Sequence, residues 1–222
     1  MIKISKRLLK ISELVKGNIV ADVGCDHGKL SEYLLKQKLC EKVIVSDISK
    51  SSLQKAINLL SKEKLNFESI HCNGLVGYKD KVIDECIISG MGGDEIIKII
   101  SSSPIEIKSY ILSPQHNIID VKKFMLDNGF TITFDKIIKD KNKFYTILKC
   151  VKNGEFVPIT IFDLYFGQDN FNKNCDDFKD FLECELKKNI LLMDKVDDKK
   201  KSEILEYINL IEIAKKRLVK YE

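Results

Sequence analysis

Short apolar segments that end in polar residues or glycine recur along the first 150 residues of the chain. Most of them span five or six residues, are rich in Ile and Val, and precede a stretch in which apolar residues repeat at three- and four-residue steps. A short apolar run is typical of a buried strand, and the longer period is typical of an amphipathic helix. We therefore expect five strands, at residues 18–23, 42–47, 67–72, 84–89 and 109–113. Helices are expected to follow four of them, at residues 28–37, 49–62, 94–101 and 118–128.

The same pattern predicts further elements on both sides of these units. Apolar residues recur at helical spacing over residues 3–15, so a first helix is expected to end before Gly17. Two more strands are expected at residues 130–138 and 143–151, because the polar stretch 139–142 between them has the composition of a hairpin turn.

The C-terminal third of the chain has a helical period throughout. After a short connector that contains Pro158, residues 160–193 are expected to form one helical segment and residues 200–220 a second. Residues 194–199 between them are polar and predict a hinge. Two amphipathic helices joined by a short loop form an antiparallel hairpin.

Alternation of strands and helices favours an α/β fold with a mostly parallel sheet. We expect a Rossmann-like, doubly wound sheet of seven strands with an antiparallel hairpin at its edge, and a helical hairpin beyond it. This divides the chain into a nucleotide-binding type of domain at 1–153 and a helical domain at 154–222. Loops that follow parallel strands share one edge of the sheet, where ligands bind. Five loops are expected there, at residues 22–28, 47–49, 73–75, 90–93 and 113–116.

The composition is that of a globular chain with one substantial core. No apolar run approaches the roughly 18 residues of a membrane span, and the first residues lack a signal-peptide pattern. We expect a cytoplasmic protein with no membrane partner. The seven cysteines show no C-x-x-C pair and no histidine at zinc-ligand spacing, so they are expected to be reduced, and no metal site is expected.

The charge is distributed unevenly along the chain. Residues 1–150 hold 24 Lys and Arg against 18 Asp and Glu, whereas residues 151–222 hold 13 against 15. A basic first part favours a polyanionic partner. The excess is weak as a signal, because 35 of the 37 basic residues are lysine.

The loop from Asp22 to Gly28 carries the most specific chemistry. It follows an apolar strand and contains glycine, as in folds that hold a nucleotide-like ligand. A dinucleotide fingerprint has glycine at its first, third and sixth positions, which are here Gly24, Asp26 and Lys29. The Asp26 carboxylate would repel a diphosphate but attract the ammonium and sulfonium groups of S-adenosylmethionine. The spacing therefore favours a methyl-donor pocket over an NAD site.

The later loops allow both functional and purely structural interpretations. Asp47 is placed to accept hydrogen bonds from ribose hydroxyls, or to stabilise a helix N-terminus. Asn73 and Gly74 suit an adenine edge, or a plain turn. The glycines around Met91 permit close backbone approach to a ligand. Cys25 is either a reactive thiol in the ligand loop or a small residue that fills a tight turn.

Four segments together resemble one family. They are DVGCDHGKL at 22–30, ISGMGG at 88–93, LSPQ at 112–115, and NGF at 128–130 followed by KFY at 143–145. Their order and spacing resemble those of the bacterial tRNA (adenine-N1)-methyltransferases that modify position 22. Asn73 stands where that family usually has Asp, and Gln115 stands where it usually has Asn after the proline. The first departure falls on the contact with the donor's adenine, and the second falls on the pocket for the target base.

The resemblance implies a class I S-adenosylmethionine-dependent enzyme that acts on tRNA, and we expect a monomer. The implied donor-binding residues are Asp22, Gly24, Asp26, Gly28, Asp47, Ile48, Asn73, Gly74, Gly90 and Met91. The implied catalytic residues are Asp26, His27 and Asp94. The implied tRNA-binding residues are Lys3, Lys6, Arg7 and Lys10 for phosphates, and Pro114, Gln115 and His116 for the target base.

Two other functions are compatible with the pattern. A non-catalytic RNA- or nucleotide-binding module would retain the donor pocket without chemistry. An NAD-dependent oxidoreductase would use the same fold, but Asp26 and Lys29 disfavour it.

Overall fold

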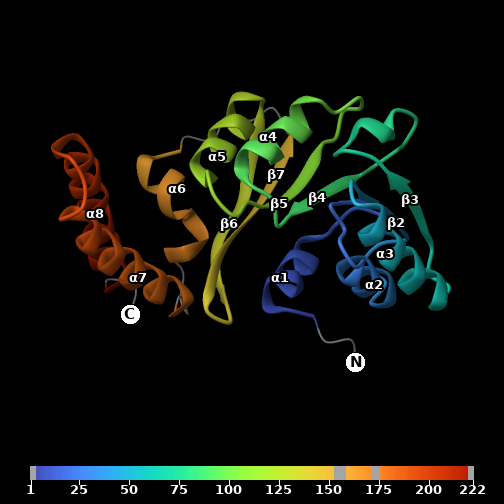
Figure 1. Cartoon of the computed structure of the whole chain (residues 1–222), viewed down its shortest axis with the longest axis horizontal. Helices are drawn as coiled ribbons and strands as arrows, with labels where there is room; N and C mark the ends of the chain where they lie inside the picture. Colours follow the sequence, from blue (N-terminus) through green and yellow to red (C-terminus); the bar gives the residue numbers. More distant parts are fainter. Residues whose placement is uncertain (1–3, 153–158, 172–175, 220–222) are drawn as a thin grey trace.

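The seven strands of the protein form a single mixed sheet in the order β3-β2-β1-β4-β5-β7-β6 (Figure 1). The computed structural model describes residues 4–152, 159–171 and 176–219. The four pairings that join β3, β2, β1, β4 and β5 are parallel, β7 pairs antiparallel with β5, and β6 pairs antiparallel with β7. The strands are β1 Ile19–Val23, β2 Lys42–Asp47, β3 Phe67–His71, β4 Glu85–Ser89, β5 Ser109–Ser113, β6 Phe130–Asp140 and β7 Lys143–Lys152. The expected doubly wound sheet with an antiparallel edge hairpin is confirmed.

Helices cover both faces of the sheet, because alternate strand residues point to opposite sides. Val20 and Val43 face a core closed by three helices, whereas Ala21 and Ile44 face a core closed by two others. The first group is α1 Lys6–Leu14, α2 Lys29–Lys36 and α3 Lys50–Lys62. The second group is α4 Gly93–Ser101 and α5 Ile118–Asp127, with the short 3-10 helix Val76–Tyr78 beside it.

Most element boundaries match those expected from the sequence to within two residues. Residues 42–47 and 109–113 are strands as expected, whereas the strand expected at 84–89 begins one residue later. The reason is that the Asp84 carboxylate accepts the backbone N–H groups of Asn18 and Ile19, at 2.9 and 2.8 Å, and so caps the start of β1. The backbone N–H of Asp84 also donates to the Ile19 carbonyl at 2.9 Å, so Asp84 joins the start of β1 through both its backbone and its side chain.

The single helical segment expected at 160–193 is wrong. The chain forms α6 Ile161–Phe166, a 3-10 helix at Gln168–Phe171 and α7 Asp176–Met193. Gly167 ends α6 with a φ of 71°, and a Cβ there would lie 2.6 Å from the carbonyl oxygen of Asp135. Close approach to β6 thus requires glycine and interrupts the helix. The expected connector at Pro158 lies outside the described residues.

The expected helical hairpin is formed by α7 and α8 Asp198–Val219, which lie together beyond β6 at one end of the molecule (Figure 1). A third hydrophobic cluster joins this hairpin to the sheet. Its buried members are Ile137, Phe166, Phe171, Phe178, Leu182, Ile211, Ala214 and Leu218. The hairpin therefore packs on the edge strand through an aromatic-rich interface.

A buried ion pair also ties the helical part to the sheet. Lys122 Nζ of α5 lies 2.5 Å from Asp135 Oδ2 of β6, and both residues are buried. The same ammonium donates hydrogen bonds to the carbonyl oxygens of Asp163 and Leu164 in α6, at 3.1 and 2.8 Å. One lysine thus connects α5, β6 and α6.

Replacing Lys122 with methionine should lower the free energy of unfolding at pH 7 by about 3 kcal/mol, because it leaves a buried carboxylate without its partner. Burial already raises the pKa of Asp135 to about 6, so the unpaired carboxyl will be neutral at pH 5 and the loss should be smaller there. Urea unfolding at both pH values measures this. The exposed neighbour supplies the control, Lys123→Met; an equal loss at the two pH values would show that the charge of Asp135 is not the cause.

Candidate active site

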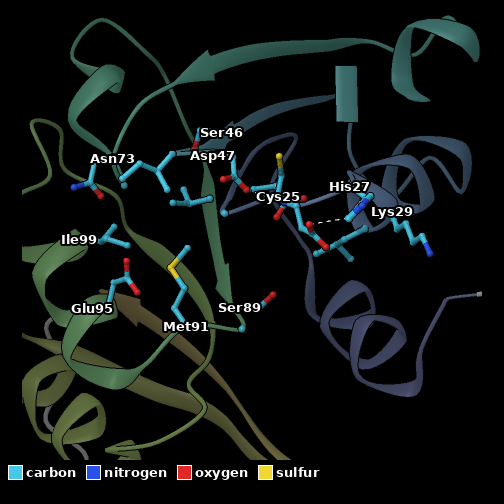
Figure 2. Close-up of a pocket in the computed structure, with 18 of the residues that line it drawn as sticks. Cys25, His27, Lys29, Ser46, Asp47, Asn73, Ser89, Met91, Glu95 and Ile99 are labelled. Atoms are coloured by element: carbon cyan, nitrogen blue, oxygen red, sulfur yellow. Dashed lines mark hydrogen bonds and ion pairs between the residues drawn. The ribbon is translucent and has the colours of Figure 1, made fainter. Parts of the chain in front are cut away.

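The loops that follow the parallel strands meet around a cavity of about 600 Å³, which we call the edge cavity (Figure 2). Helix α1 closes one side of it with Arg7 and Leu8. From β1 and its loop it is lined by Asp22, Val23, Gly24, Cys25, Asp26, His27, Lys29 and Leu30. From the other loops it is lined by Ser46, Asp47, Ile48, Cys72, Asn73, Gly74, Ser89, Gly90, Met91, Glu95, Ile99 and Gln115. The expected meeting of five loops at one edge is confirmed.

Asp47 holds the loop that follows β1 in place. Its Oδ2 accepts the backbone N–H of Asp26 at 3.1 Å, and its Oδ1 accepts that of Ser49 at 2.8 Å. The N–H groups of Gly24 and Cys25 donate to the Ser46 carbonyl, at 2.8 and 3.0 Å. A carboxylate has about four acceptor sites, so Asp47 retains capacity for hydroxyl donors of a ligand.

Asp22 lies beneath this loop as a buried carboxyl group. Ser31 Oγ donates a 2.5 Å hydrogen bond to Asp22 Oδ2. Burial raises the pKa of Asp22 to about 6, the Ser31 hydrogen bond opposes that rise, and the negative charge of Asp47 adds to it. A cation in the edge cavity would therefore be stabilised by the ionised form of Asp22.

Asp26 and His27, which both line the cavity, form a pair that the dashed line at His27 marks in Figure 2. His27 Nδ1 lies 2.7 Å from Asp26 Oδ1, and Lys55 Nζ lies 3.2 Å from His27 Nε2. A lysine can only donate, so Nε2 accepts and Nδ1–H donates to the carboxylate. The side chain of Asp26 stays 71% exposed, which leaves it available to a substrate.

The opposite wall is built from the loops that follow β4 and β5. The backbone N–H of Gln115 donates to the Met91 carbonyl at 2.9 Å, and its side-chain Nε2 donates to the Gly90 carbonyl at 2.8 Å. A Cβ on Gly93 would lie 2.7 Å from two backbone oxygens of the β5 loop, and a Cβ on Gly24 would clash with the methyl end of Met91. Gly93 therefore lets the loops that follow β4 and β5 pack together, and Gly24 is required for its φ of 72°.

Most of the residues expected to bind the donor line the edge cavity. Those that do so are Asp22, Gly24, Asp26, Asp47, Ile48, Asn73, Gly74, Gly90 and Met91. Gly28 does not, because it starts α2 at a φ of 70° and packs against Ala56. Of the expected catalytic residues, Asp26 and His27 line the cavity and Asp94 does not. The Asp94 carboxylate accepts a 2.9 Å hydrogen bond from Asn117, and the next residue, Glu95, faces the cavity instead (Figure 2).

The residues expected to bind tRNA lie in different surroundings. Lys6 Nζ pairs with Asp177 at 2.6 Å, and Lys10 pairs with Glu13, so both ammonium groups already have acidic partners. Arg7 lines the edge cavity, with its guanidinium carbon 4.9 Å from the centre of the Tyr145 ring. Lys3 lies outside the described residues.

Of the three residues expected at the target base, only one lines the edge cavity. Gln115 lines the edge cavity, Pro114 is buried and lines a neighbouring cavity, and His116 packs beside Gly92 without lining the edge cavity.

Several lining residues were not expected from the sequence, among them Glu95, Ser89, Cys72 and Ile99. One position along a helix turns the side chain by about 100° around the axis, so the helical period showed that Asp94 and Glu95 cannot both face the cavity. Cys25 is buried, and burial raises the pKa of its thiol well above the ordinary value. Its thiol therefore stays protonated, which favours a packing role over a reactive one.

The described ranges contain no cluster of three or more His, Cys, Asp and Glu residues that could hold a metal ion. Within the same ranges, no helix is both long and apolar enough to cross a membrane.

The known proteins to which the chain is similar are methyltransferases. Residues 4–148 match the methyltransferase domain family. The chain is 29% identical, over 98% of both chains, to a putative tRNA methyltransferase of Mycoplasma genitalium. It is 25% identical to the tRNA (adenine(22)-N(1))-methyltransferase of Bacillus subtilis, over 66% of this chain and 64% of that protein.

A solved structure shares the fold over nearly the whole chain. M. capricolum TrmK, in complex with the cofactor product S-adenosyl-homocysteine, superposes with a TM-score of 0.87 at 24% identity. The match covers 97% of this chain and 99% of that one. The shared fold therefore includes the C-terminal helices as well as the sheet.

Proposed function

Since the chain belongs to the methyltransferase domain family, as a TrmK-like member, we propose that it methylates N1 of adenine 22 in tRNA. The donor is S-adenosylmethionine, as in the family. The observation that carries the proposal is the edge cavity, in which loops from the parallel strands and helix α1 surround a volume of about 600 Å³.

The residues of the edge cavity fit a cationic donor. Four carboxylates line it, whereas its lysine and arginine side chains number two. The carboxylates are Asp22, Asp26, Asp47 and Glu95, and the cations are Arg7 and Lys29. An acidic cavity attracts ammonium and sulfonium groups and repels a diphosphate. This charge balance favours methyl transfer over NAD-dependent chemistry.

S-adenosylmethionine, when bound, supplies a methyl group on a positively charged sulfur. Asp47 would accept hydrogen bonds from its ribose hydroxyls, because the carboxylate ends β2 and lines the cavity. Asn73 would meet the adenine edge with an amide that both donates and accepts. Asp22 and Asp26 would hold the positive charges of the amino-acid end.

Methylation of N1 consists of one displacement. The N1 lone pair forms a bond to the methyl carbon while the carbon–sulfur bond breaks, so that the adenine becomes cationic and the leaving sulfur neutral. Positioning of the two reactants supplies most of the rate. Asp26 would stabilise the new cation, because its carboxylate lines the cavity and is exposed to the substrate. His27 would orient Asp26 through its Nδ1–H.

The proposed function gives each of the two expected domains a role. We assign residues 1–153 to donor binding and catalysis and residues 154–222 to tRNA binding. The packing of α7 against β6, with Lys6 of α1 paired to Asp177 of α7, supports a helical part that acts beside the catalytic domain.

Donor affinity should increase as the pH rises through about 6. The raised pKa of Asp22 means that the carboxyl is largely neutral at pH 5, and a cationic donor prefers the ionised form. We expect binding about tenfold weaker at pH 5 than at pH 7.5 in titration calorimetry, because one pH unit below the pKa leaves about a tenth of the groups ionised. Asp22→Asn should remove this dependence. His27 lines the same cavity, so His27→Gln, which leaves Asp22 in place, is the control and should retain the dependence. Loss of the dependence in that variant would exclude Asp22 as its cause.

The proposed function is tested by incubating the protein with methyl-labelled S-adenosylmethionine and unmodified tRNA. Digestion of the tRNA should yield labelled N1-methyladenosine. Label in another nucleoside, or only in protein, would refute the proposal. Retained tRNA binding without methyl transfer would instead indicate a non-catalytic binding module.

A further inference from the structure

A second cavity, of about 890 Å³, lies next to the edge cavity, between the β6–β7 hairpin and the C-terminal helices. We call it the aromatic groove. Its aromatic lining residues are Phe144, Tyr145, Tyr165, Phe181 and Tyr207. They come from β7, α6, α7 and α8, so the groove exists only because the helical part packs on the sheet edge.

The aromatic rings of the groove are only partly buried. Phe144 and Phe181 meet edge to face with their centres 5.5 Å apart, and Tyr165 and Tyr207 lie 5.4 Å apart. All four side chains remain of intermediate exposure. Tyr207 also stacks on Phe166, with ring centres 6.3 Å apart and planes 17° apart. The rings are therefore held in place, and the part of each that solvent still reaches is a surface on which an unpaired nucleic-acid base can stack.

The groove also has polar and cationic groups at its margins. Glu185 accepts a 3.5 Å hydrogen bond from the Tyr207 hydroxyl and pairs with Lys188 at 3.2 Å. Lys143 is exposed on the hairpin and lines the groove. Carboxylate and hydroxyl groups suit the polar edge of a base, and this lysine suits a phosphate beside it.

The groove is continuous with the edge cavity. Gln115 lines both, and Arg7, which lines the edge cavity, stacks on the ring of Tyr145, which lines the groove. A strand of RNA whose target base enters beside Gln115 therefore has this groove as its next surface. Because N1 lies on the Watson–Crick edge, the target must leave its pair, and the bases beside it lose a stacking neighbour.

We propose that the aromatic groove binds the base of a nucleotide next to the target adenine, stacked against Phe144 and Tyr207. This rests on the proposed function, since it assigns a second subsite for the same RNA strand. It gives the helical part a direct role in holding the nucleotides around the reaction centre.

The test is steady-state methylation and equilibrium tRNA binding with the variants Phe144→Leu and Tyr207→Leu, which keep an apolar side chain but remove the ring. Loss of one stacked base is worth roughly 1–3 kcal/mol, so KM for tRNA and the Kd of the tRNA complex should each rise about tenfold. kcat at saturating tRNA and the Kd for S-adenosylmethionine should stay within about twofold of wild type, which also shows that the variants are folded. Tyr33→Leu removes a partly exposed ring on α2, outside the groove, and should change neither constant.

Cross-linking of the wild-type protein tests the same proposal without depending on the stability of a variant. Wild-type protein is cross-linked to tRNA that carries a photoreactive base on one side of position 22 and then on the other. For one of the two, the cross-linked peptide should contain Phe144 or Tyr207. Cross-links elsewhere in both cases, or an unchanged KM and Kd in both variants, would overturn the proposal, as would a wild-type dimer that these variants dissociate. If wild-type protein made no N1-methyladenosine, the proposed function would fail, and the binding and cross-linking results would still decide whether the groove holds RNA.

Discussion

Replacing Asp47 with alanine should weaken the binding of S-adenosylmethionine at least 100-fold. The Asp47 carboxylate is placed to accept hydrogen bonds from the donor's ribose, and each charge-assisted hydrogen bond contributes about 1.5–3 kcal/mol. The variant also removes the acceptor of the Asp26 and Ser49 N–H groups, so the loop that follows β1 loses its anchor. Titration calorimetry measures the change directly.

Two further variants separate ligand contact from loop anchoring. Asp47→Asn keeps an oxygen for the loop but lacks the charge, so its loss should be smaller than that of alanine. Asp80→Ala removes an exposed acid outside the edge cavity and should leave the affinity unchanged. An Asp47→Ala protein that binds the donor within threefold of wild type would show that Asp47 does not contact it.

Replacing Asp26 with asparagine should lower kcat for tRNA methylation by about 100-fold while weakening donor binding less than tenfold. The reason is that its charge is proposed to stabilise the cation that forms on the adenine, and removing one such group typically costs 10²–10³ in rate. Asparagine is the suitable replacement because Asp26 has a φ of 50°, a left-handed conformation that Asn also tolerates. Single-turnover methylation separates this effect from binding.

The control for Asp26 is its partner residue. His27→Gln removes the ring that pairs with Asp26 but keeps the carboxylate, so the loss in kcat should stay below about tenfold. If His27→Gln were the more damaging of the two, the histidine itself would have to act on the substrate, and the role given to Asp26 would be wrong.

The sequence predicted the sheet well because its signals are local. Residues 42–47 and 109–113 are apolar runs bounded by polar residues, and both are strands within the expected limits. The loops after these strands reached the same edge because parallel strands leave no other arrangement. The apolar pattern and the spacing of the strands were therefore sufficient to predict at which edge of the sheet the loops meet.

The features that the sequence did not predict depend on tertiary contacts. The end of α6 is partly an exception, because Gly167 is a local stop signal that the expected segment 160–193 overlooked. The approach of Asp135 adds the tertiary reason for glycine at that position. Asp94 and Glu95 are adjacent acids, and the choice between them depends on the rotation of α4 against the sheet. The acidic partner of Lys6 is 171 residues away in the chain, so its pairing has no local signal.

The most direct test of the account is methylation of two tRNA transcripts that differ only at position 22. With adenine at that position, one methyl group per tRNA should be transferred and should map to N1 of nucleotide 22. With guanine there, transfer should fall to background. Equal transfer to both transcripts, or a methyl group that maps to another nucleotide, would contradict the proposed specificity.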